Sequence, residues 1–182
     1  MIVTLAGAVR TVSAVRDAVL VISSSSASKS SSPDAMSGAG APSDGACTAR
    51  MNVRAVNTAR AAYGLPPLVL SSALSAVANE HSWDMLTNGY FSHTSIDGRT
   101  KENRLNNAGI SYSWNGENIC YSYNAARSPT DVLNWCHSQF MSEPYPGYSN
   151  HIGNILSTHY HKIGIGIAVS GAKVYITWDF TD

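Results

Sequence analysis

Four side chains in this sequence could act together on a metal ion or a bound ligand. They are two histidines and two glutamates, His93, Glu117, Glu143 and His151. Two imidazoles and two carboxylates suit Zn²⁺ or a similar divalent cation in tetrahedral or slightly expanded geometry. The four are spread over about sixty residues and lack the i, i+4 pairing of a helical zinc motif. Their spacing alone therefore does not establish a shared site.

Glu117 is the residue that most needs a partner. It stands in Gly116-Glu117-Asn118-Ile119 and is followed by residues of β character. A carboxylate at the mouth of a partly buried strand is costly unless it is paired, hydrogen-bonded or metal-bound. Two interpretations are open: a share in a metal or ligand site, or a structural role in which loop N–H groups and His93 hold the carboxylate.

The elements that must position these residues are indicated by apolar spacing, caps and stop signals. The expected helices are a run over 49–63 ended by Gly64, a second from Ser71 or Ser72 to 88–89, a short one over 100–108 and a fourth that begins at Ser128-Pro129. The last part of the chain predicts a hairpin of 163–170 and 173–179. Helices on both sides of a small, mostly antiparallel sheet indicate an α+β sandwich.

The chain divides into an N-terminal segment, 1–46, and a domain, 47–182. In the segment, two arginines precede a short apolar run at 18–22, and 23–45 is dominated by Ser, Ala, Gly and Pro. That composition cannot bury enough apolar surface to offset the entropy of ordering, so it predicts a flexible linker. The order of charged, apolar and small residues indicates a degraded export signal, although a truncated gene would give the same pattern.

Composition limits the partners that this chain can have. Twelve Lys and Arg balance twelve Asp and Glu, and no basic cluster exists, so nothing predicts binding to nucleic acid or to an anionic membrane. No apolar run approaches the ~20 residues that span a bilayer, which predicts no transmembrane segment. Cys120 and Cys136 could pair and leave Cys47 over, or all three could be thiols, so cysteine counting does not fix the compartment.

Nine short motifs follow one another between residues 56 and 180. They are Asn57-Thr58-Ala59-Arg60, Gly64-Leu65-Pro66-Pro67-Leu68, Met85 with Tyr90-Phe91-Ser92-His93, Asp97-Gly98-Arg99-Thr100, Arg104-Leu105 with Ala108-Gly109, Gly116-Glu117-Asn118-Ile119, Trp135, His151 with Asn154-Ile155-Leu156, and Ile163-Gly164-Ile165-Gly166. In this order they resemble the CAP superfamily, which groups cysteine-rich secretory proteins, venom antigen 5 and plant pathogenesis-related proteins. The chain is most similar to the bacterial members with an SCP-like domain.

The resemblance implies a three-layer α-β-α sandwich with a central cleft. It also implies a tetrad of two histidines and two glutamates, which binds a divalent metal in some members. His93 matches the first family histidine, Glu117 the first glutamate and His151 the second histidine. The second glutamate normally lies between the helix tryptophan and that histidine, which makes Glu143 the candidate, although many short bacterial members lack it.

For function, the resemblance implies a secreted or cell-surface module whose cleft binds a small-molecule, lipid-like or peptide ligand, with or without zinc or another divalent cation, and without settled catalysis. The alternative is a metal-dependent hydrolase of peptides or esters. There, zinc on His93 and His151 would lower the pKa of a bound water, and Glu117 or Glu143 would be the general base. A third interpretation treats the tetrad as a hydrogen-bonded brace and the outer surface as the functional part.

Overall fold

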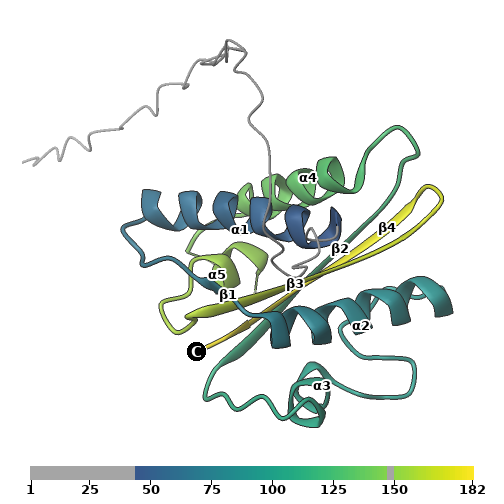
Figure 1. Ribbon diagram of the computed structural model, residues 1–182. Coiled ribbons are helices and arrows are strands. Elements are labelled where there is room, and N and C mark those ends of the chain that lie inside the picture. The colour runs from purple at the N-terminus through teal and green to yellow at the C-terminus, as the bar shows by residue number, and fades with distance from the viewer. Residues whose placement is uncertain (1–43, 147–149) are drawn as a thin grey trace, which may run out of the picture. The chain divides into compact units, whose positions relative to one another are not determined.

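The structure is a computed structural model, which describes residues 44–146 and 150–182. The predicted export signal and nearly all of the predicted linker lie outside the described residues. Along the chain the elements (Figure 1) are α1 (Asp44–Ala62), β1 (Val69–Leu70), α2 (Ser72–Asn88), α3 (Lys101–Asn107), β2 (Asn115–Tyr123), α4 (Pro129–Met141), α5 (His151–Ile155), β3 (Lys162–Ser170) and β4 (Lys173–Thr181). None of the described helices is long and apolar enough to cross a membrane.

The four strands form one mixed sheet in the order β1-β3-β4-β2. β4 pairs antiparallel with both β3 and β2, and only the two-residue β1 pairs in parallel, with β3. The prediction of a small, mostly antiparallel sheet that includes the C-terminal hairpin is therefore confirmed. The register places Glu117 of β2 directly opposite Asp179 of β4.

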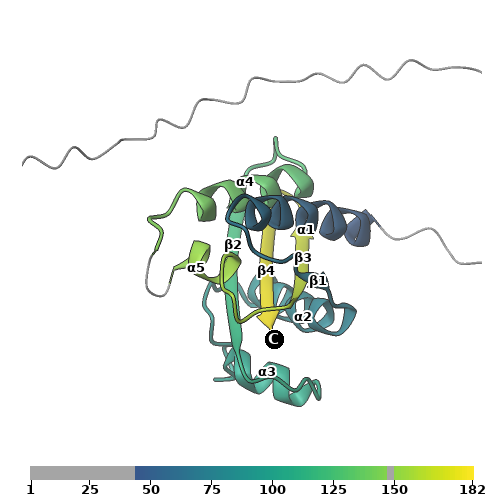
Figure 2. The same cartoon turned by 90° about the vertical axis from the view of Figure 1, so that its left-hand side faces the viewer.

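Helices cover both faces of this sheet (Figure 1). α1, α4 and α5 pack on one face, and α2 packs on the other with α3 beside it. Figure 2 shows β2 at one edge of the sheet, with α5 next to it. The predicted α-β-α sandwich is confirmed.

Local sequence explains where the helices begin and end. The side chain of Ser71 caps α2 by accepting from the N–H of Leu74, and Gly89 ends that helix with a left-handed φ of 68°. Ser128 and Asp131 form a capping box at the start of α4, with Pro129 in the first turn. Capped starts of this kind satisfy N–H groups that the helix itself leaves unpaired, which is why they could be predicted from the sequence.

Two glycines in β3 let α2 lie directly on the sheet. A Cβ at Gly164 would come within 2.2 Å of the backbone of Leu74, and one at Gly166 within 2.1 Å of the backbone of Ala78. Both contacts are far shorter than van der Waals distance, so any side chain at these positions would push the helix away from the strand. This close packing fixes the first half of α2 on the sheet, and the loop that carries His93 follows this helix.

A disulfide joins the sheet to the helical layer that contains α4. Cys120 of β2 is bonded to Cys136 of α4, and Cys47 is an exposed free thiol. Of the two arrangements that the sequence leaves open, the structure has the paired one. Cys136 is fully buried within the main hydrophobic core, so the bond is part of the interior of the domain.

Candidate functional site

The first half of the candidate site is a buried carboxylate under an exposed imidazole. Nδ1 of His93, in the loop after α2, lies 2.7 Å from Oε1 of Glu117 on β2. The Glu117 side chain is 1% exposed and that of His93 is 55% exposed. Glu117 therefore holds one nitrogen of the ring, and the rest of the imidazole faces solvent.

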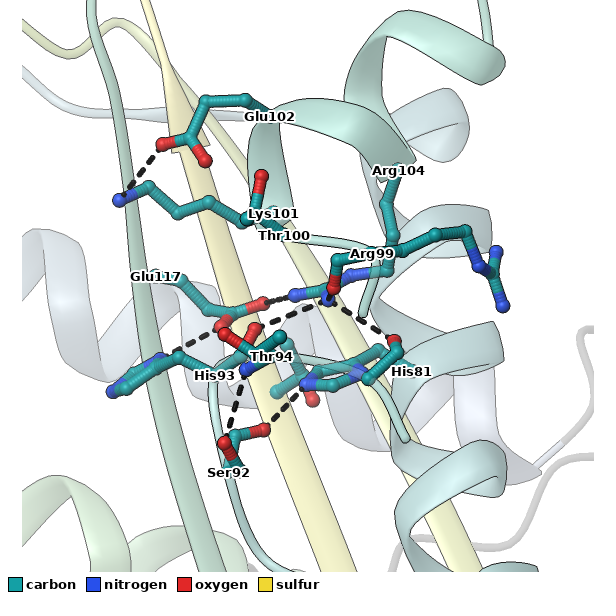
Figure 3. A network of polar contacts seen from close by, with 12 residues as sticks. His81, Ser92, His93, Thr94, Arg99, Thr100, Lys101, Glu102, Arg104 and Glu117 are labelled. Carbon is teal, nitrogen blue, oxygen red and sulfur yellow. Dashed lines mark hydrogen bonds and ion pairs between the residues drawn. The ribbon is translucent and has the colours of Figure 1, made fainter. Parts of the chain in front are cut away.

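Arg104 of α3 takes the other oxygen of this carboxylate. Its Nη2 donates to Oε2 of Glu117 at 2.5 Å, and both side chains are almost completely buried. Its Nη1 donates to the carbonyl oxygens of His93 and Arg99, at 3.1 and 3.2 Å. Figure 3 shows Glu117 between His93 and Arg104, so one guanidinium fixes both the carboxylate and the loop that bears the histidine.

These partners decide the charge of Glu117. Burial alone would raise its pKa, but the hydrogen bond from His93 and the positive charge of Arg104 oppose burial, and the pKa ends below its ordinary value. Glu117 is therefore an anion at neutral pH and accepts from Nδ1–H of His93. Because Nδ1 carries the proton in the neutral ring, the lone pair lies on Nε2.

Asp179 adds a second buried carboxyl group next to Glu117. Burial raises the pKa of Asp179 well above its ordinary range, and the charge of Glu117 and a hydrogen bond with it act in the same direction. Two adjacent buried carboxyl groups cannot both ionise cheaply. Of the two carboxyl groups, Asp179 is therefore the harder to ionise, and Glu117 carries the negative charge more readily.

The second half of the candidate site lies around the start of α5. Nδ1 of His151 is 2.5 Å from Oε1 of Glu143, and Oε2 accepts from the backbone N–H groups of His151 and Ile152, at 2.7 and 3.3 Å. The ring of His151 stacks on Phe140 with centroids 4.2 Å apart. The pKa of Glu143 ends below its ordinary value because the hydrogen bond from His151 and the N–H of Ile152 outweigh the effect of burial.

Two asparagines connect the halves. The side-chain amide of Asn154 on α5 donates to the backbone oxygen of Glu117, at 3.2 Å, and to Oδ1 of Asn118, at 2.7 Å. Asn118 in turn donates to the carbonyl of His151 at 3.0 Å. Side chains of consecutive strand residues point to opposite faces. One His–Glu pair therefore meets β2 from the α2–α3 side, and the other is attached to β2 from the α5 side.

The predicted residues are thus brought together as two pairs. Glu117 pairs with His93, and its other carboxylate partner is Arg104, whereas His151, which the resemblance places in the same tetrad, pairs with Glu143. Among the described residues, no group of three or more His, Cys, Asp or Glu side chains is arranged to hold a metal ion. Both carboxylates are occupied, so the groups free to meet a ligand are the Nε2 atoms. That the four residues share one metal ion stays a prediction.

Sequence reasoning did not identify Arg104 and Asp179 as part of the site. In the sequence, Arg104 is noted only as part of the motif Arg104-Leu105. Its neighbours in the chain do not indicate that a short helix places its side chain over β2. Asp179 carries the same signal as Glu117, since it is an acid within the apolar strand Lys173–Thr181. A cavity of about 470 Å³ is lined by residues at the end of α3 and after it, including Ile110 and Tyr112, and by none of the four candidate residues.

The comparisons with known proteins agree with this fold. Residues 53–180 match the model of the family described as "CAP: Cysteine-rich secretory protein family". Over 133 residues the chain is 31% identical to the uncharacterized protein YkwD of Bacillus subtilis (strain 168), a match that covers 72% of this chain and 47% of YkwD. The chain thus spans about half the length of that relative.

Two solved structures share the fold. An extracellular protein containing a SCP domain from Bacillus anthracis str. Ames has a TM-score of 0.57 and 24% identity, over 74% of this chain and 40% of the other. An outer surface protein from Borrelia burgdorferi has a TM-score of 0.61 and 18% identity, over 73% of this chain and 90% of the other.

Proposed function

Because the chain belongs to the CAP, or cysteine-rich secretory protein, family, we propose that it is an exported binding module. Its ligand is held by the outward nitrogens of His93 and His151 and is not turned over. One observation carries this proposal: each histidine is bound through Nδ1 by its own glutamate, at 2.7 Å for His93 and 2.5 Å for His151. Two imidazoles are thereby held with Nε2 free.

In this arrangement the two histidines, and not the two glutamates, would coordinate a metal ion. Glu117 and Glu143 are engaged by Arg104 and by backbone N–H groups, so they act on a metal as orienting partners of the ligands. Carboxylates in this position fix the ring and raise the basicity of the coordinating nitrogen. A divalent cation such as zinc would be held by Nε2 of His93 and of His151, and it would supply a positive charge that attracts anionic or carbonyl groups.

Hydrolysis is the weaker alternative for the same residues. A metal-dependent hydrolase needs a carboxylate free to take a proton from the attacking water. Oε1 and Oε2 of Glu117 are both occupied, and the same is true of Glu143. Hydrolysis would require one of these carboxylates to give up its hydrogen bonds, whereas binding without turnover requires no such rearrangement.

Two observations support export. The Cys120–Cys136 disulfide lies in the core, and such bonds persist in oxidising compartments outside the cytosol. The two similar solved structures are named as an extracellular and an outer surface protein. The proposed ligand belongs to one of three classes: a small molecule, a lipid-like molecule or a peptide.

Zinc titration of the Cys47→Ser protein by calorimetry tests the two-histidine site. We expect one zinc per chain, loss of binding in both His93→Ala and His151→Ala, and an affinity about 10- to 100-fold weaker in Glu143→Gln, which loses only the orienting carboxylate. His161→Ala is the matched control, because His161 is exposed and lies outside both pairs. Equal zinc binding by wild type and the double variant of His93 and His151 would rule out this metal site.

A further inference from the structure

β2 is the long exposed edge of the sheet. The sheet ends in β1 on one side and β2 on the other, and β1 has two residues where β2 has nine. In Figure 2, β2 lies at the edge with no strand beyond it. An edge strand presents N–H and C=O groups that another strand can pair with.

The register shows which residues of β2 point these groups outward. Asn115 is opposite Thr181, and the Thr181 oxygen accepts from the N–H of His161, on the side of β4 away from β2. In an antiparallel ladder the backbone groups of Asn115 must then face outward, and so must those of every second residue after it. Tyr160 and Asn154 confirm this, because they donate to the oxygens of Asn115 and Glu117.

The second half of this edge has no such cover. The outward residues Tyr121 and Tyr123 are 41% and 56% exposed, and their outward backbone groups have no partner among the described residues. Proteins usually protect long edges with charged residues or proline. The stretch 118–126 contains neither.

Aromatic rings border the open half. Phe91, which is 43% exposed, packs against Tyr121 with centroids 4.7 Å apart. Tyr121 and Tyr123 are 5.1 Å apart, and both pack on the buried ring of Tyr175. Three exposed rings on one face, fixed from below by a fourth, form a rigid apolar surface beside unpaired backbone groups.

We propose that the open half of β2 pairs with the same segment of a second copy of this chain. The strands run antiparallel about a two-fold axis at Ser122, which places Tyr121 opposite the partner subunit's Tyr123. This register sets outward-facing residues against outward-facing residues, so the backbone groups of both tyrosines find partners. It also forms two tyrosine–tyrosine pairs across the interface.

The absence of charge favours a second copy over a foreign segment. In a two-fold interface every charge on the axis meets its own sign, and an uncharged strand avoids that repulsion. Residues 118–126 carry no charge of their own, and the ammonium group of Lys173 on β4 lies over the ring of Tyr123, 5.6 Å from its centroid. The segment is complementary to itself.

Sedimentation equilibrium of the full chain, from low to high micromolar concentration, tests the dimer. We expect a reversible dimer in wild type and at least a tenfold weaker association in Tyr121→Lys, which places two ammonium groups in the interface. Trp83→Lys is the control, because Trp83 is an equally exposed aromatic residue on α2 and should leave the dimer intact. A wild-type chain that stays monomeric, or a dimer that Tyr121→Lys does not weaken, overturns the proposal.

A cross-link provides a second test that does not depend on how well the lysine variant folds. Opposite residues in an antiparallel pair have Cα atoms about 4.5–5.5 Å apart, which suits a disulfide. In the Cys47→Ser background, Ser122→Cys should oxidise to a covalent dimer. Ser170→Cys, an exposed position at the end of β3, should not. Equal cross-linking of the two variants contradicts the proposed register.

Discussion

At the scale of residues, one ionised carboxylate is shared by several buried groups. Glu117 receives a hydrogen bond from His93 and one from Arg104, and it lies opposite the buried carboxyl group of Asp179. The desolvation cost of a buried anion is met by these partners together, and the removal of any one leaves polar groups without a partner. The exposed imidazole is the outermost member of this cluster.

Asp179 makes the stability of the domain depend on pH. Its pKa in the folded state lies above the 3.8 of an ordinary aspartate, so its contribution to stability is fully present below that value and is lost as pH rises. Asp179→Asn stays neutral and removes this loss. We expect the free energy of unfolding of Asp179→Asn to increase relative to that of wild type as the pH rises above about 4, by up to about 1.4 kcal/mol per pH unit.

Urea denaturation of both proteins at several pH values measures this difference. Glu80→Gln is a suitable control, because Glu80 is an exposed acid that forms a surface ion pair with Arg99. Parallel pH profiles for wild type and Asp179→Asn would show that Asp179 is ionised in the folded protein.

Individual site residues could be predicted only where the sequence carries a signal of its own. The need of Glu117 for a partner followed from a carboxylate in a strand, and His93 was proposed as that partner. Arg104 could not be predicted, because its role depends on how α3 is placed against β2 and not on its neighbours in the chain. The pairing of Glu143 with His151 was not predicted, since these two residues belong to a different layer from Glu117 and His93.

At the scale of elements, Gly116 fixes the distance between β2 and α5. A Cβ at this position would come within 2.6 Å of both Oδ1 of Asn154 and the hydroxyl of Tyr160. These are the same two side chains that bind the outer edge of β2. The contact explains why glycine precedes Glu117 in this strand.

Gly116→Ala should therefore destabilise the domain and disturb the half of the site that contains His151. We expect a loss of about 1–3 kcal/mol in the free energy of unfolding, the usual cost of overpacking, and weaker zinc binding. Ser122→Ala, on the same strand but away from α5, should change the free energy of unfolding by no more than about 0.5 kcal/mol and leave zinc binding as it is. Denaturation and calorimetry on the two variants distinguish a local clash from a general effect of strand substitution. Wild-type values for Gly116→Ala would contradict the packing described.

Elements with chemical end signals were the easiest to predict. Ser71 and Ser128 begin α2 and α4 as expected, and Gly89 ends α2. α1 begins at Asp44, ahead of the predicted domain boundary at 47. β1 is only two residues long and depends on pairing with β3, a contact that no local pattern contains.

At the scale of the whole domain, the central sheet is attached to one helical layer by a covalent bond. Cys120 and Cys136 are 16 residues apart, and their bond crosses from β2 to α4 within the core. The bond reduces the conformational entropy of the unfolded chain. In the folded protein it holds the layer that carries Glu143 and His151 against the strand that carries Glu117.

Replacement of both cysteines by alanine should lower the free energy of unfolding by about 3 kcal/mol, the value for a loop of this length. Cys47→Ala is the control and should be neutral, because that thiol is exposed and unpaired. Thermal and urea unfolding of the oxidised wild type and both variants gives the comparison. A double variant as stable as Cys47→Ala would mean that packing alone holds α4 to the sheet.

The unequal edges of the sheet also set a limit on assembly. On the side of the sheet away from β2, β1 pairs with Lys162 and Ile163 of β3, and the N–H groups of Ile165 and Ile167 donate to side chains of α2. A chain with two long edges could add copies at both ends and polymerise into fibres, as unprotected sheets do. Here a two-fold contact through β2 would use up the open edge residues of each protomer, so growth stops at two copies. The cover that β1 and α2 give to β3 would thus protect the protein from amyloid-like extension while leaving β2 free to pair.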